Sequence, residues 1–216
     1  MKILPPVLKN CTEISDVRIL YSGCEKEERM ENLAINSADL TGASLPRAEF
    51  SFVKFSGCRF GEANFKGSDF CDILFESCDF SNADFSNSSF RRTIWRGCKG
   101  VGADFSECSF RDTVFESDVL SYANFNRTKL RSFSFENCDL ACADLAECSL
   151  KDAVFSKTKF FRANLSGTML KGMDLSDCDL GAITLSSAFF ELRGATIGLL
   201  QGEAFLRALG INIKNL

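Results

Sequence analysis

Hydrophobic residues in this chain recur with a period of five, which differs from the 3.6 of an amphipathic helix and the 2 of a half-buried strand. Every fifth position from Ile35 to Phe190 holds Ile, Leu, Phe or Trp, with Gly100 as the exception. Two residues before such a position the side chain is usually small, as at Cys78 and Ala83. The pattern continues without an insertion, so it predicts a solenoid whose repeats contact only their neighbours.

The repeat unit, A(D/N)(L/F)XX, resembles that of the pentapeptide repeat family. It is clearest in Ala83-Asp84-Phe85, Ala103-Asp104-Phe105 and Ala163-Asn164-Leu165. The resemblance implies an all-β fold, a right-handed quadrilateral β-helix in which each repeat forms one side of a coil. The central and the small residue then both point inward. One of them is small because the interior cannot hold two bulky groups per side at close-packed density. Neighbouring coils are expected about 4.8 Å apart.

Changes in the pattern divide the chain into three predicted segments. Residues 1–34 form an irregular N-terminal coil and loop, residues 35–197 the β-helix, and residues 198–216 a C-terminal helix and tail. Within the first segment, Ile14, Ile19 and Cys24 have the spacing of an imperfect coil. The charged stretch Glu25–Glu31 is out of register and predicts an exposed loop, either a solvated connection or a functional one.

The C-terminal segment is expected to cap the last coil. Leu192 and Ile197 indicate one shifted turn, and the following residues predict a short helix that stops at Gly210. Its apolar residues exceed what one buried face needs, which favours pairing with a second copy over a monomeric cap. The predicted dimerisation residues are Leu199, Leu200, Phe205, Leu206, Leu209 and Ile211.

Eleven cysteines are present, and their positions indicate their chemistry. Seven occupy the small inward position: Cys58, Cys78, Cys98, Cys108, Cys138, Cys148 and Cys178. On stacked coils their Cβ vectors run parallel in an apolar interior, so we expect reduced, space-filling thiols. Reduced cysteines in such numbers predict a cytoplasmic protein.

Two residues break the inward pattern in the middle of the chain. Gly100 replaces a large core residue, and Asp118 takes a small inward position one coil later on the same face. A buried carboxylate needs partners. We therefore expect this face to bulge or kink, either as a structural irregularity or as a recognition feature.

Composition excludes several classes of function. There is no His, so Ser-His and Cys-His catalytic pairs and the usual zinc sites are ruled out. No phosphate-binding loop motif occurs, and we predict no enzyme activity, no cofactor and no metal. The net charge of −4 and pI near 5.1 argue against direct binding of nucleic acid. No apolar run is long enough to predict a membrane span.

Outward charges segregate by face, with acid on two adjacent faces and a basic stripe elsewhere. The candidate partner-binding residues on the acidic faces are Asp79, Asp84, Asp104, Glu107, Asp139, Asp144 and Glu147. The basic stripe, which recurs once per coil, is Arg91, Arg111, Arg131, Lys151 and Lys171. A line of carboxylates can imitate DNA phosphates. The alternative is that Asp only supports the turn through local hydrogen bonds.

Beyond the repeat, the chain resembles the quinolone-resistance (Qnr-type) branch of the family. The resemblance lies in Cys78–Ser89, Arg96–Phe105, Leu120–Phe125 and the tail Leu192–Ile211. It implies a protein that binds DNA gyrase or topoisomerase IV in place of, or alongside, duplex DNA and protects it from quinolones or a gyrase-directed toxin. It also implies a homodimer of two rods joined end to end by their C-terminal helices.

One departure from that branch keeps a second hypothesis open. Many Qnr-type proteins insert a long loop near the middle of the rod, and the loop is linked to protection. Here the register runs unbroken through Arg111–Val119, so the loop is absent. The alternative function is a protein-interaction scaffold with a different partner.

Overall fold

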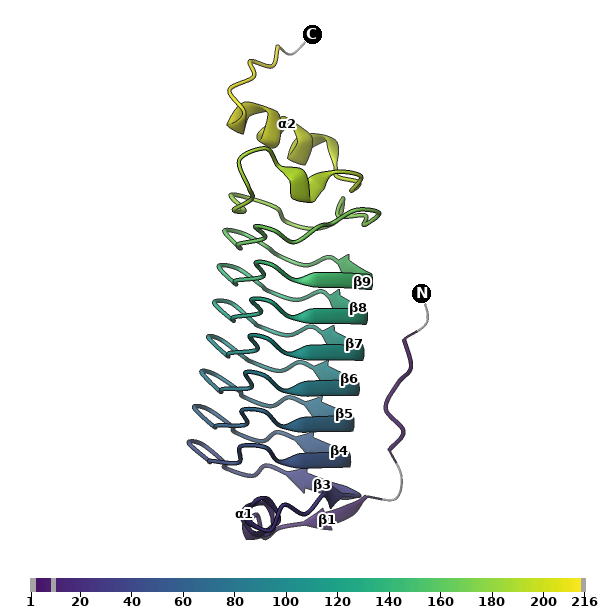
Figure 1. Cartoon of the computed structure of the whole chain (residues 1–216), viewed down its shortest axis with the longest axis vertical. Helices are drawn as coiled ribbons and strands as arrows, with labels where there is room; N and C mark the ends of the chain where they lie inside the picture. The colour runs from purple at the N-terminus through teal and green to yellow at the C-terminus, as the bar shows by residue number, and fades with distance from the viewer. Residues whose placement is uncertain (1–2, 9–10, 215–216) are drawn as a thin grey trace.

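The computed structural model describes residues 3–8 and 11–214, and these form a parallel β-helix closed by a helix at each end (Figure 1). The strands are β1 (Thr12–Ile14), β2 (Met30–Glu31), β3 (Leu33–Asn36), β4 (Glu49–Ser56), β5 (Asp69–Glu76), β6 (Ser89–Arg96), β7 (Ser109–Glu116), β8 (Lys129–Glu136) and β9 (Ser149–Ser156). The helices are α1 (Arg18–Glu25), the short 3₁₀ helix η1 (Phe190–Leu192) and α2 (Leu199–Ala208). The predicted fold class is therefore confirmed.

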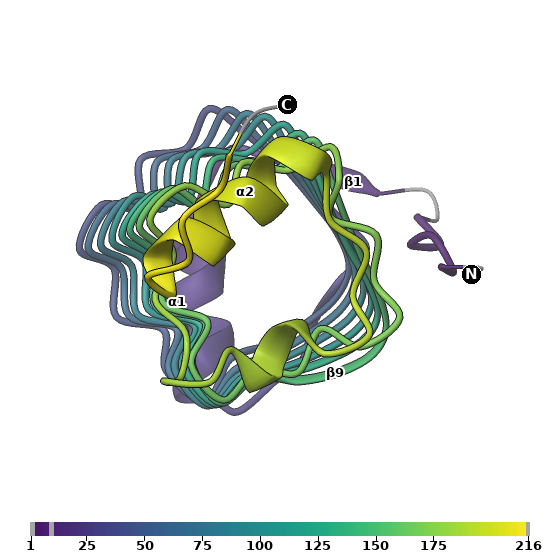
Figure 2. The same ribbon diagram turned by 90° about the horizontal axis from the view of Figure 1, so that it is seen from above.

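Each coil repeats the previous one in a constant register. Strands β3 to β9 stack in sequence order, so that Phe55 pairs with Phe75 and Phe75 with Trp95. Isolated bridges such as Asn64 to Asp84 continue the same register on the sides of the coil that lack long strands. Seen along the rod axis, the coils superimpose on a four-sided outline (Figure 2). The predicted coil, with one pentapeptide on each of its four sides, is thus the repeating unit.

The corners of the coil depend on left-handed backbone. Every fifth residue from Glu27 to Gly172 has a positive φ, including large side chains such as Arg92 and Tyr122. A left-handed conformation costs a non-glycine residue about 1–2 kcal/mol. The corners also form hydrogen bonds between coils, as when the Glu107 N–H donates to the carbonyl of Asn126 at 2.9 Å. Stacking of the coils therefore stabilises a backbone shape that a single repeat would not hold.

Aromatic rings fill the interior in continuous stacks. Phe85 and Phe105 on successive coils lie with centroids 5.1 Å apart and planes 2° apart. Within one coil the rings meet edge to face, as do Phe85 and Phe90 at 65°. Both arrangements are favourable for aromatic quadrupoles. The interior therefore fixes each coil both along the axis and around it.

All eleven cysteines are free, as predicted, and the seven inward ones are buried. The buried thiols point to carbonyls of the preceding coil, for example Cys108 Sγ to the oxygen of Phe85 at 2.9 Å. Burial raises the pKa of Cys138 to about 12. These thiols act as small core residues with an internal hydrogen-bond acceptor.

The bulge expected near Gly100 and Asp118 does not occur. Val119 forms bridges to Lys99 on the preceding coil and Asp139 on the following one, so the ladder passes this level unchanged. The space left by Gly100 is filled by Leu120, whose Cδ2 would lie 2.9 Å from a Cβ at position 100. The Asp118 side chain turns inward, where its Oδ1 accepts the Cys98 N–H at 2.5 Å. Its Oδ2 is buried without a hydrogen-bond partner among the described residues, and the backbone nevertheless keeps its register.

The N-terminal end contains a helix that the sequence pattern did not predict. β1 pairs with β3 as a first partial coil, but α1 replaces the remainder of that coil. Leu20 of α1 is buried, and Gly23 lets the helix approach Met30 closely. Met30 is also buried and pairs with Phe50, so the expected exposed loop at Glu25–Glu31 is wrong at this residue.

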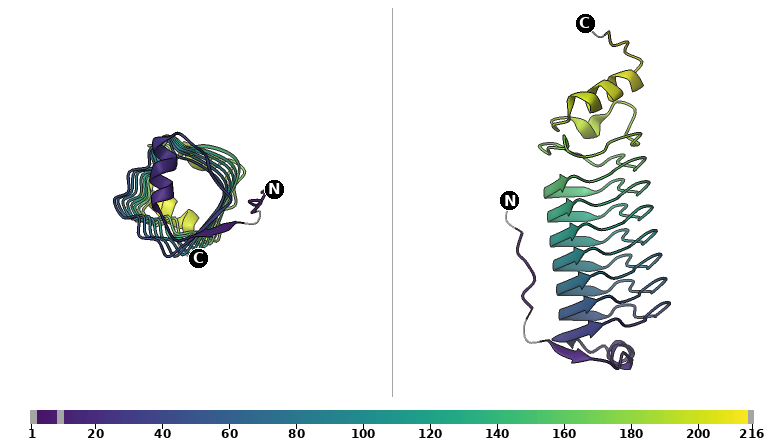
Figure 3. Two further views of the ribbon diagram at one scale, coloured as in Figure 1. Left: turned by 90° about the horizontal axis from the view of Figure 1, so that it is seen from below. Right: turned by 180° about the vertical axis from the view of Figure 1, so that it is seen from behind.

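Residues 3–8 form an extended strap that runs beside the stacked strands, roughly along the rod axis (Figures 1 and 3). The Val7 N–H donates to Asp72 Oδ1 at 3.0 Å, and the Leu4 N–H lies 3.5 Å from Asp112 Oδ1. The strap was not predicted. Residues 1, 2, 9, 10, 215 and 216 of the predicted terminal segments lie outside the described residues.

The shifted turn predicted at the C-terminal end is confirmed. Asp174 bridges Thr196, whereas the regular register would bring it opposite Gly194. The buried carboxylate of Glu191 holds this turn, since it accepts the Gly167 N–H at 2.8 Å and the Ser186 hydroxyl at 2.9 Å. Burial opposes ionisation of Glu191, but these donors outweigh it and lower its pKa.

Asp118 gives the fold a testable pH dependence. Burial raises the pKa of its carboxyl from 3.8 to about 7, so the folded protein retains a proton that the unfolded chain has lost. The stability that this site provides at low pH is therefore lost as the pH rises from about 4 to about 7, by up to roughly 4 kcal/mol. Urea unfolding measures the free energy of unfolding of Asp118→Asn and of the wild type at pH 5 and pH 8. The value of the variant minus that of the wild type should be a few kcal/mol larger at pH 8 than at pH 5. An equal difference at both pH values would contradict this account.

Candidate functional site

The constant register of the coils aligns outward side chains into columns parallel to the rod axis. A column here means the residues at equivalent positions of successive coils. The seven predicted acidic residues fall in three columns: Asp79 with Asp139, then Asp84 with Asp104 and Asp144, then Glu107 with Glu147. The three columns differ in how far their charges are neutralised.

The first column alternates in sign. It runs Asp39, Arg59, Asp79, Lys99, Val119, Asp139, Lys159 and Asp179. Arg59 Nη2 lies 2.6 Å from Asp39 Oδ2, and Lys99 Nζ lies 3.4 Å from Asp79 Oδ2. Opposite charges on successive coils cancel at a distance, so this column presents little net field.

The third column is also partly neutralised. Arg127 lies between Glu107 and Glu147, and its Nε is 2.9 Å from Glu147 Oε2. Both partners of that pair are about 60% exposed, so the pair adds little stability. It does reduce the negative charge that a binding partner would meet.

Asp84, Asp104 and Asp144 keep their charge, and we call these three residues the carboxylate column. Among the described residues, no Lys or Arg lies within ion-pair distance of any of them. Asp84 and Asp104 are direct neighbours in this column, and the other residues next to the three aspartates are the neutral amides Asn64, Asn124 and Asn164. Asn124 Nδ2 donates to Asp104 Oδ1 at 3.0 Å.

Asp139 and Glu107 have no ion pair among the described residues either, but Lys159 and Arg127 lie next to them in their columns. Of the predicted acidic positions, those of the carboxylate column are the ones without a neighbouring cation in their column.

A structural role for these aspartates is confirmed as well. In each, Oδ1 accepts the N–H of the residue two positions later, at 2.8 Å from Ser86 to Asp84 and 2.9 Å from Ala146 to Asp144. No hydrogen bond to Oδ2 of the three occurs within the part of the chain that the structure describes. One oxygen supports the turn, and the other is left without a protein partner there. Asn satisfies the turn equally, so the choice of Asp sets the charge.

The predicted basic stripe is confirmed as a column on another side of the coil. Arg91, Arg111, Arg131 and Lys151 are direct cross-strand neighbours on β6 to β9. Lys171 continues the same spacing beyond β9. We call these five residues the basic column.

One charged cluster was missed from the sequence. Asp72 is fully buried beneath the strap, in ion-pair contact with Arg92 on the next coil. Burial would raise the pKa of Asp72, but the hydrogen bonds from Arg92 and from the Val7 N–H outweigh it, so the pKa is lowered. Opposite charges at equivalent positions of successive coils were a signal in the sequence, whereas the strap that buries them had none.

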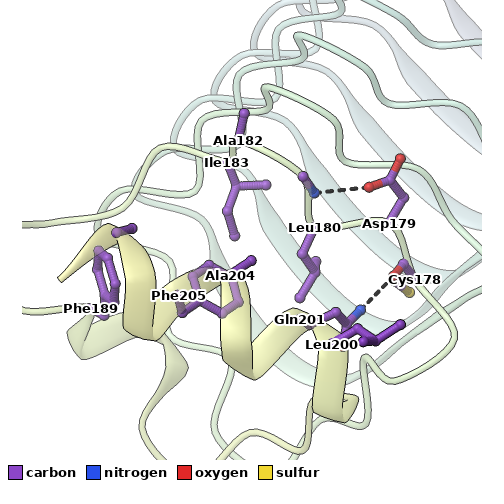
Figure 4. Close-up of a pocket in the computed structure, with 12 residues that line it drawn as sticks. Cys178, Asp179, Leu180, Ala182, Ile183, Phe189, Leu200, Gln201, Ala204 and Phe205 are labelled. Carbon is purple, nitrogen blue, oxygen red and sulfur yellow. Dashed lines mark hydrogen bonds between the residues drawn. The ribbon is translucent and has the colours of Figure 1, made fainter. Parts of the chain in front are cut away.

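The C-terminal helix α2 lies over the last coil, with a pocket of about 440 Å³ between them (Figure 4). Gln201 fastens the helix, since its Nε2 donates to the carbonyls of Leu175 at 3.0 Å and Cys178 at 2.6 Å. Phe205 also faces the rod and meets Phe189 edge to face, with centroids 5.8 Å apart. Phe205 thus belongs to the cap and not to the outward surface for which it was predicted.

The other predicted dimerisation residues are exposed, and one of them, Leu200, also lines the pocket beneath α2. Leu199 is 89% exposed and Leu200 80% exposed. Leu206, Leu209 and Ile211 are exposed as well. Together these five residues form an apolar end surface, which we call the end patch.

The described residues show no arrangement for metal chemistry. Within residues 3–8 and 11–214, no three His, Cys, Asp or Glu side chains are grouped so that they could hold a metal ion. None of the helices in the same part of the chain is long and apolar enough to cross a membrane.

Comparison with protein families agrees with the architecture. A family described as "Pentapeptide repeat region" matches residues 68–145, and one described as "Pentapeptide repeats (8 copies)" matches residues 36–72 and 138–177. Together they span residues 36–177, most of the β-helix. The chain belongs to the pentapeptide repeat family. No protein of curated function matches the sequence.

Several solved structures are similar to this chain. A trypsin-treated variant of QnrB1, a plasmid-mediated fluoroquinolone resistance protein, is 27% identical over 87% of this chain and 92% of its own, with a TM-score of 0.50. A second trypsin-treated variant is 28% identical over 87% and 90%, with a TM-score of 0.46. HetL, which is involved in heterocyst differentiation regulation in the cyanobacterium Nostoc, is 23% identical over 77% and 88%, with a TM-score of 0.45. The first comparison supports the Qnr-type resemblance.

The double role of the carboxylate column predicts how its variants behave. Asp104→Asn keeps an acceptor for the Ser106 N–H, so its free energy of unfolding should change by less than about 0.5 kcal/mol. Asp104→Ala removes that acceptor and the partner of Asn124, so a loss of about 1–2 kcal/mol is expected. Urea unfolding of the two variants beside the wild type measures both values. Equal loss in both variants would show that the charge, not the turn, supports the fold.

Proposed function

We propose that this protein binds a type II topoisomerase, DNA gyrase or topoisomerase IV, through the carboxylate column, and protects it from quinolones or a gyrase-directed toxin. The observation that carries the proposal is the uncompensated charge of Asp84, Asp104 and Asp144 on a straight rod. The flanking columns contain ion pairs and carry less net charge. A cationic partner would therefore meet one line of carboxylates.

The physical basis is competition with DNA for a cationic surface. Proteins that hold duplex DNA neutralise its phosphates with Lys and Arg. Carboxylates on successive coils, such as Asp84 and Asp104, are spaced by the strand separation of about 4.8 Å, against about 3.4 Å per phosphate along one DNA strand. The column is sparser than DNA. Shape must therefore supply part of the affinity, and the straight, stacked rod provides a regular surface for it.

The family likeness supports the biological direction of the proposal. The QnrB1 variant, at 27% identity and a TM-score of 0.50, is a form of a plasmid-mediated fluoroquinolone resistance protein. The match covers most of both chains. We infer the same class of activity for this chain because its carboxylate column provides a negatively charged surface that a cationic DNA-binding site could hold.

The end patch supports a homodimer. Five apolar side chains, with Leu199 and Leu200 the most exposed, lie at one end of the rod. Exposed apolar surface of this kind is typical of an interface between copies. Two rods joined through these ends would form one longer rod with a carboxylate column on each half.

A second function, a scaffold for a different protein partner, is favoured by one observation. β7 pairs with β6 and β8 without an inserted residue, so the rod has no mid-rod loop. The Qnr-type resemblance links that loop to protection. Binding without protection would therefore be compatible with this chain, and the test below separates the two results.

The proposal is tested by gyrase supercoiling with purified protein, with and without ciprofloxacin. The wild type should restore supercoiling in the presence of the drug. The triple variant Asp84→Asn/Asp104→Asn/Asp144→Asn should lose most of this effect, because it keeps the turn hydrogen bonds and removes only charge. The matched control is Asp79→Asn/Asp139→Asn/Asp179→Asn, which removes the same charge from the alternating column and should retain most of the activity.

The outcomes separate the hypotheses. Inhibition of supercoiling without rescue would leave a topoisomerase-binding DNA mimic that does not protect. No effect of the wild type at protein concentrations well above that of gyrase would reject topoisomerase binding and leave the scaffold. Equal loss in the triple variant and its control would reject the carboxylate column as the contact surface.

The dimer makes a separate prediction. Leu199→Glu/Leu206→Glu should convert a homodimer into a monomer, because it places charge in an apolar contact. Sedimentation equilibrium measures the mass of each species. Val119→Glu/Val154→Glu, at two exposed side positions, is the control and should remain dimeric. A monomeric wild type at micromolar concentration would contradict the dimer.

A further inference from the structure

The basic column places like charges in direct contact positions. Arg111 pairs with Arg131, and Arg131 with Lys151, as cross-strand neighbours on β7 to β9. Like charges directly opposite one another on adjacent strands destabilise a sheet. A stack of cations therefore opposes the stability of the rod.

Among the described residues, the other charged columns place at most two like charges on successive coils, as at Glu116 and Glu136 or at Asp84 and Asp104. They also place opposite charges on successive coils, as Arg96 Nε beside Glu116 Oε2 at 2.8 Å and Arg127 Nε beside Glu147 Oε2 at 2.9 Å. Within the described residues, the ion pair of the basic column is Arg111 with Asp112 at 3.6 Å, on the same strand. Arg131, Lys151 and Lys171 have none there. With five cations in succession, this column is the longest stack of like charges among the described residues.

The same face already holds an extended peptide. The strap crosses it next to the basic column, with its Val7 and Leu4 N–H groups directed at Asp72 and Asp112 two coils apart. Three residues of polyproline II chain span about 9.3 Å, and two coils span about 9.6 Å. Pro5 and Pro6, which lie between the two donors, favour that conformation. The spacing of the coils thus matches the repeat of an extended chain laid along the axis.

The described residues of the strap cover only part of this face. Their hydrogen bond nearest to the C-terminal end of the rod, from Leu4 to Asp112, lies at the level of β7. Beyond it, β8 and β9 present Lys129, Arg131 and Lys151, all exposed, with Lys171 following. Asp152 is the carboxylate at this end of the two strands. This part of the face is therefore cationic and continues the path of residues 3–8.

We propose that Arg131, Lys151 and Lys171 bind an extended acidic peptide segment of a partner protein, laid along the rod axis in line with the strap. Charge complementarity and the peptide already seated on this face carry the proposal. It does not depend on topoisomerase binding, since the carboxylate column lies on another side of the coil.

An acidic peptide fits this face better than a nucleic acid does. Glu116 and Glu136 end the same strands β7 and β8 that carry Arg111 and Arg131. A single extended chain can contact the basic column without meeting those carboxylates. A duplex, whose major groove alone is about 12 Å wide, would extend towards them.

The experiment is fluorescence anisotropy with a labelled acidic peptide of alternating Glu and Pro, about 12 residues long, at about 50 mM salt. A Gln-Pro peptide of the same length is the neutral probe, and single-stranded and duplex DNA of similar length are the nucleic-acid probes. Arg131→Glu/Lys151→Glu removes the site. Lys66→Glu/Lys159→Glu makes the same change of net charge at exposed positions in other columns. Thermal unfolding confirms that both variants are folded.

The wild type should bind the Glu-Pro peptide and not the Gln-Pro peptide. Arg131→Glu/Lys151→Glu should raise the Kd at least about tenfold, and the control variant should change it less than about twofold. Equal weakening in both variants, equal binding of the neutral peptide, or no binding of the Glu-Pro peptide would overturn the proposal. Tighter binding of either DNA than of the acidic peptide would overturn it in favour of a nucleic-acid surface.

Discussion

Stacking of one coil on the next in a constant register determines almost every other feature of this protein. Burying each large aromatic ring contributes about 1.5–3 kcal/mol, and rings such as Phe85 and Phe105 bury one another along the axis. A change of register would break all of these stacks together. The backbone consequently keeps left-handed corners even at Arg92 and Tyr122. The pentapeptide repeat thus fixes the inward residues and the backbone at the corners, and it leaves the outward residues free to vary.

The constant register aligns the outward residues in columns, several of which consist of charged side chains. A side chain at one repeat lies next to its equivalents on the coils before and after it. The residue types that follow one another along a column therefore decide whether that column is neutral or charged. Arg127 beside Glu147 reduces the charge of one column, whereas the amide of Asn124 leaves the charge of Asp104 in place. Two columns on this rod escape neutralisation, one negative and one positive. We have proposed a separate partner for each, a topoisomerase for the carboxylates and an acidic peptide for the cations.

Much of the fold could be predicted because its signal repeats. The inward positions, the free cysteines, the shifted turn at Thr196 and the helix before Gly210 all followed from the pentapeptide pattern and its end. What could not be predicted occurs once in the chain and depends on three-dimensional contacts. The α1 helix is too short to show a period, and the strap is ordered by carboxylates that are distant in sequence, such as Asp112. The bulge expected at Asp118 does not form: one hydrogen bond holds Oδ1, and Oδ2 is buried without a partner among the described residues.

The acidic positions of the candidate site could be predicted from the sequence, but which of them form ion pairs could not. Sequence spacing placed Asp79 and Asp84 in equivalent roles, whereas side-chain geometry pairs Asp79 with Lys99 and leaves Asp84 without a cation among the described residues. Ion pairing depends on rotamers and reach, which a spacing does not specify. The same limit applies to Phe205, whose ring faces the rod while Leu199 in the same helix faces out.

The central claim is that the carboxylate column occupies a cationic DNA-binding surface of a type II topoisomerase. Competition measures this most directly: labelled protein is bound to purified gyrase, and linear duplex DNA is added while the anisotropy of the label is followed. The account predicts complete displacement by DNA, with binding of the two mutually exclusive. A stable ternary complex at saturating DNA, with the label still bound, would contradict it.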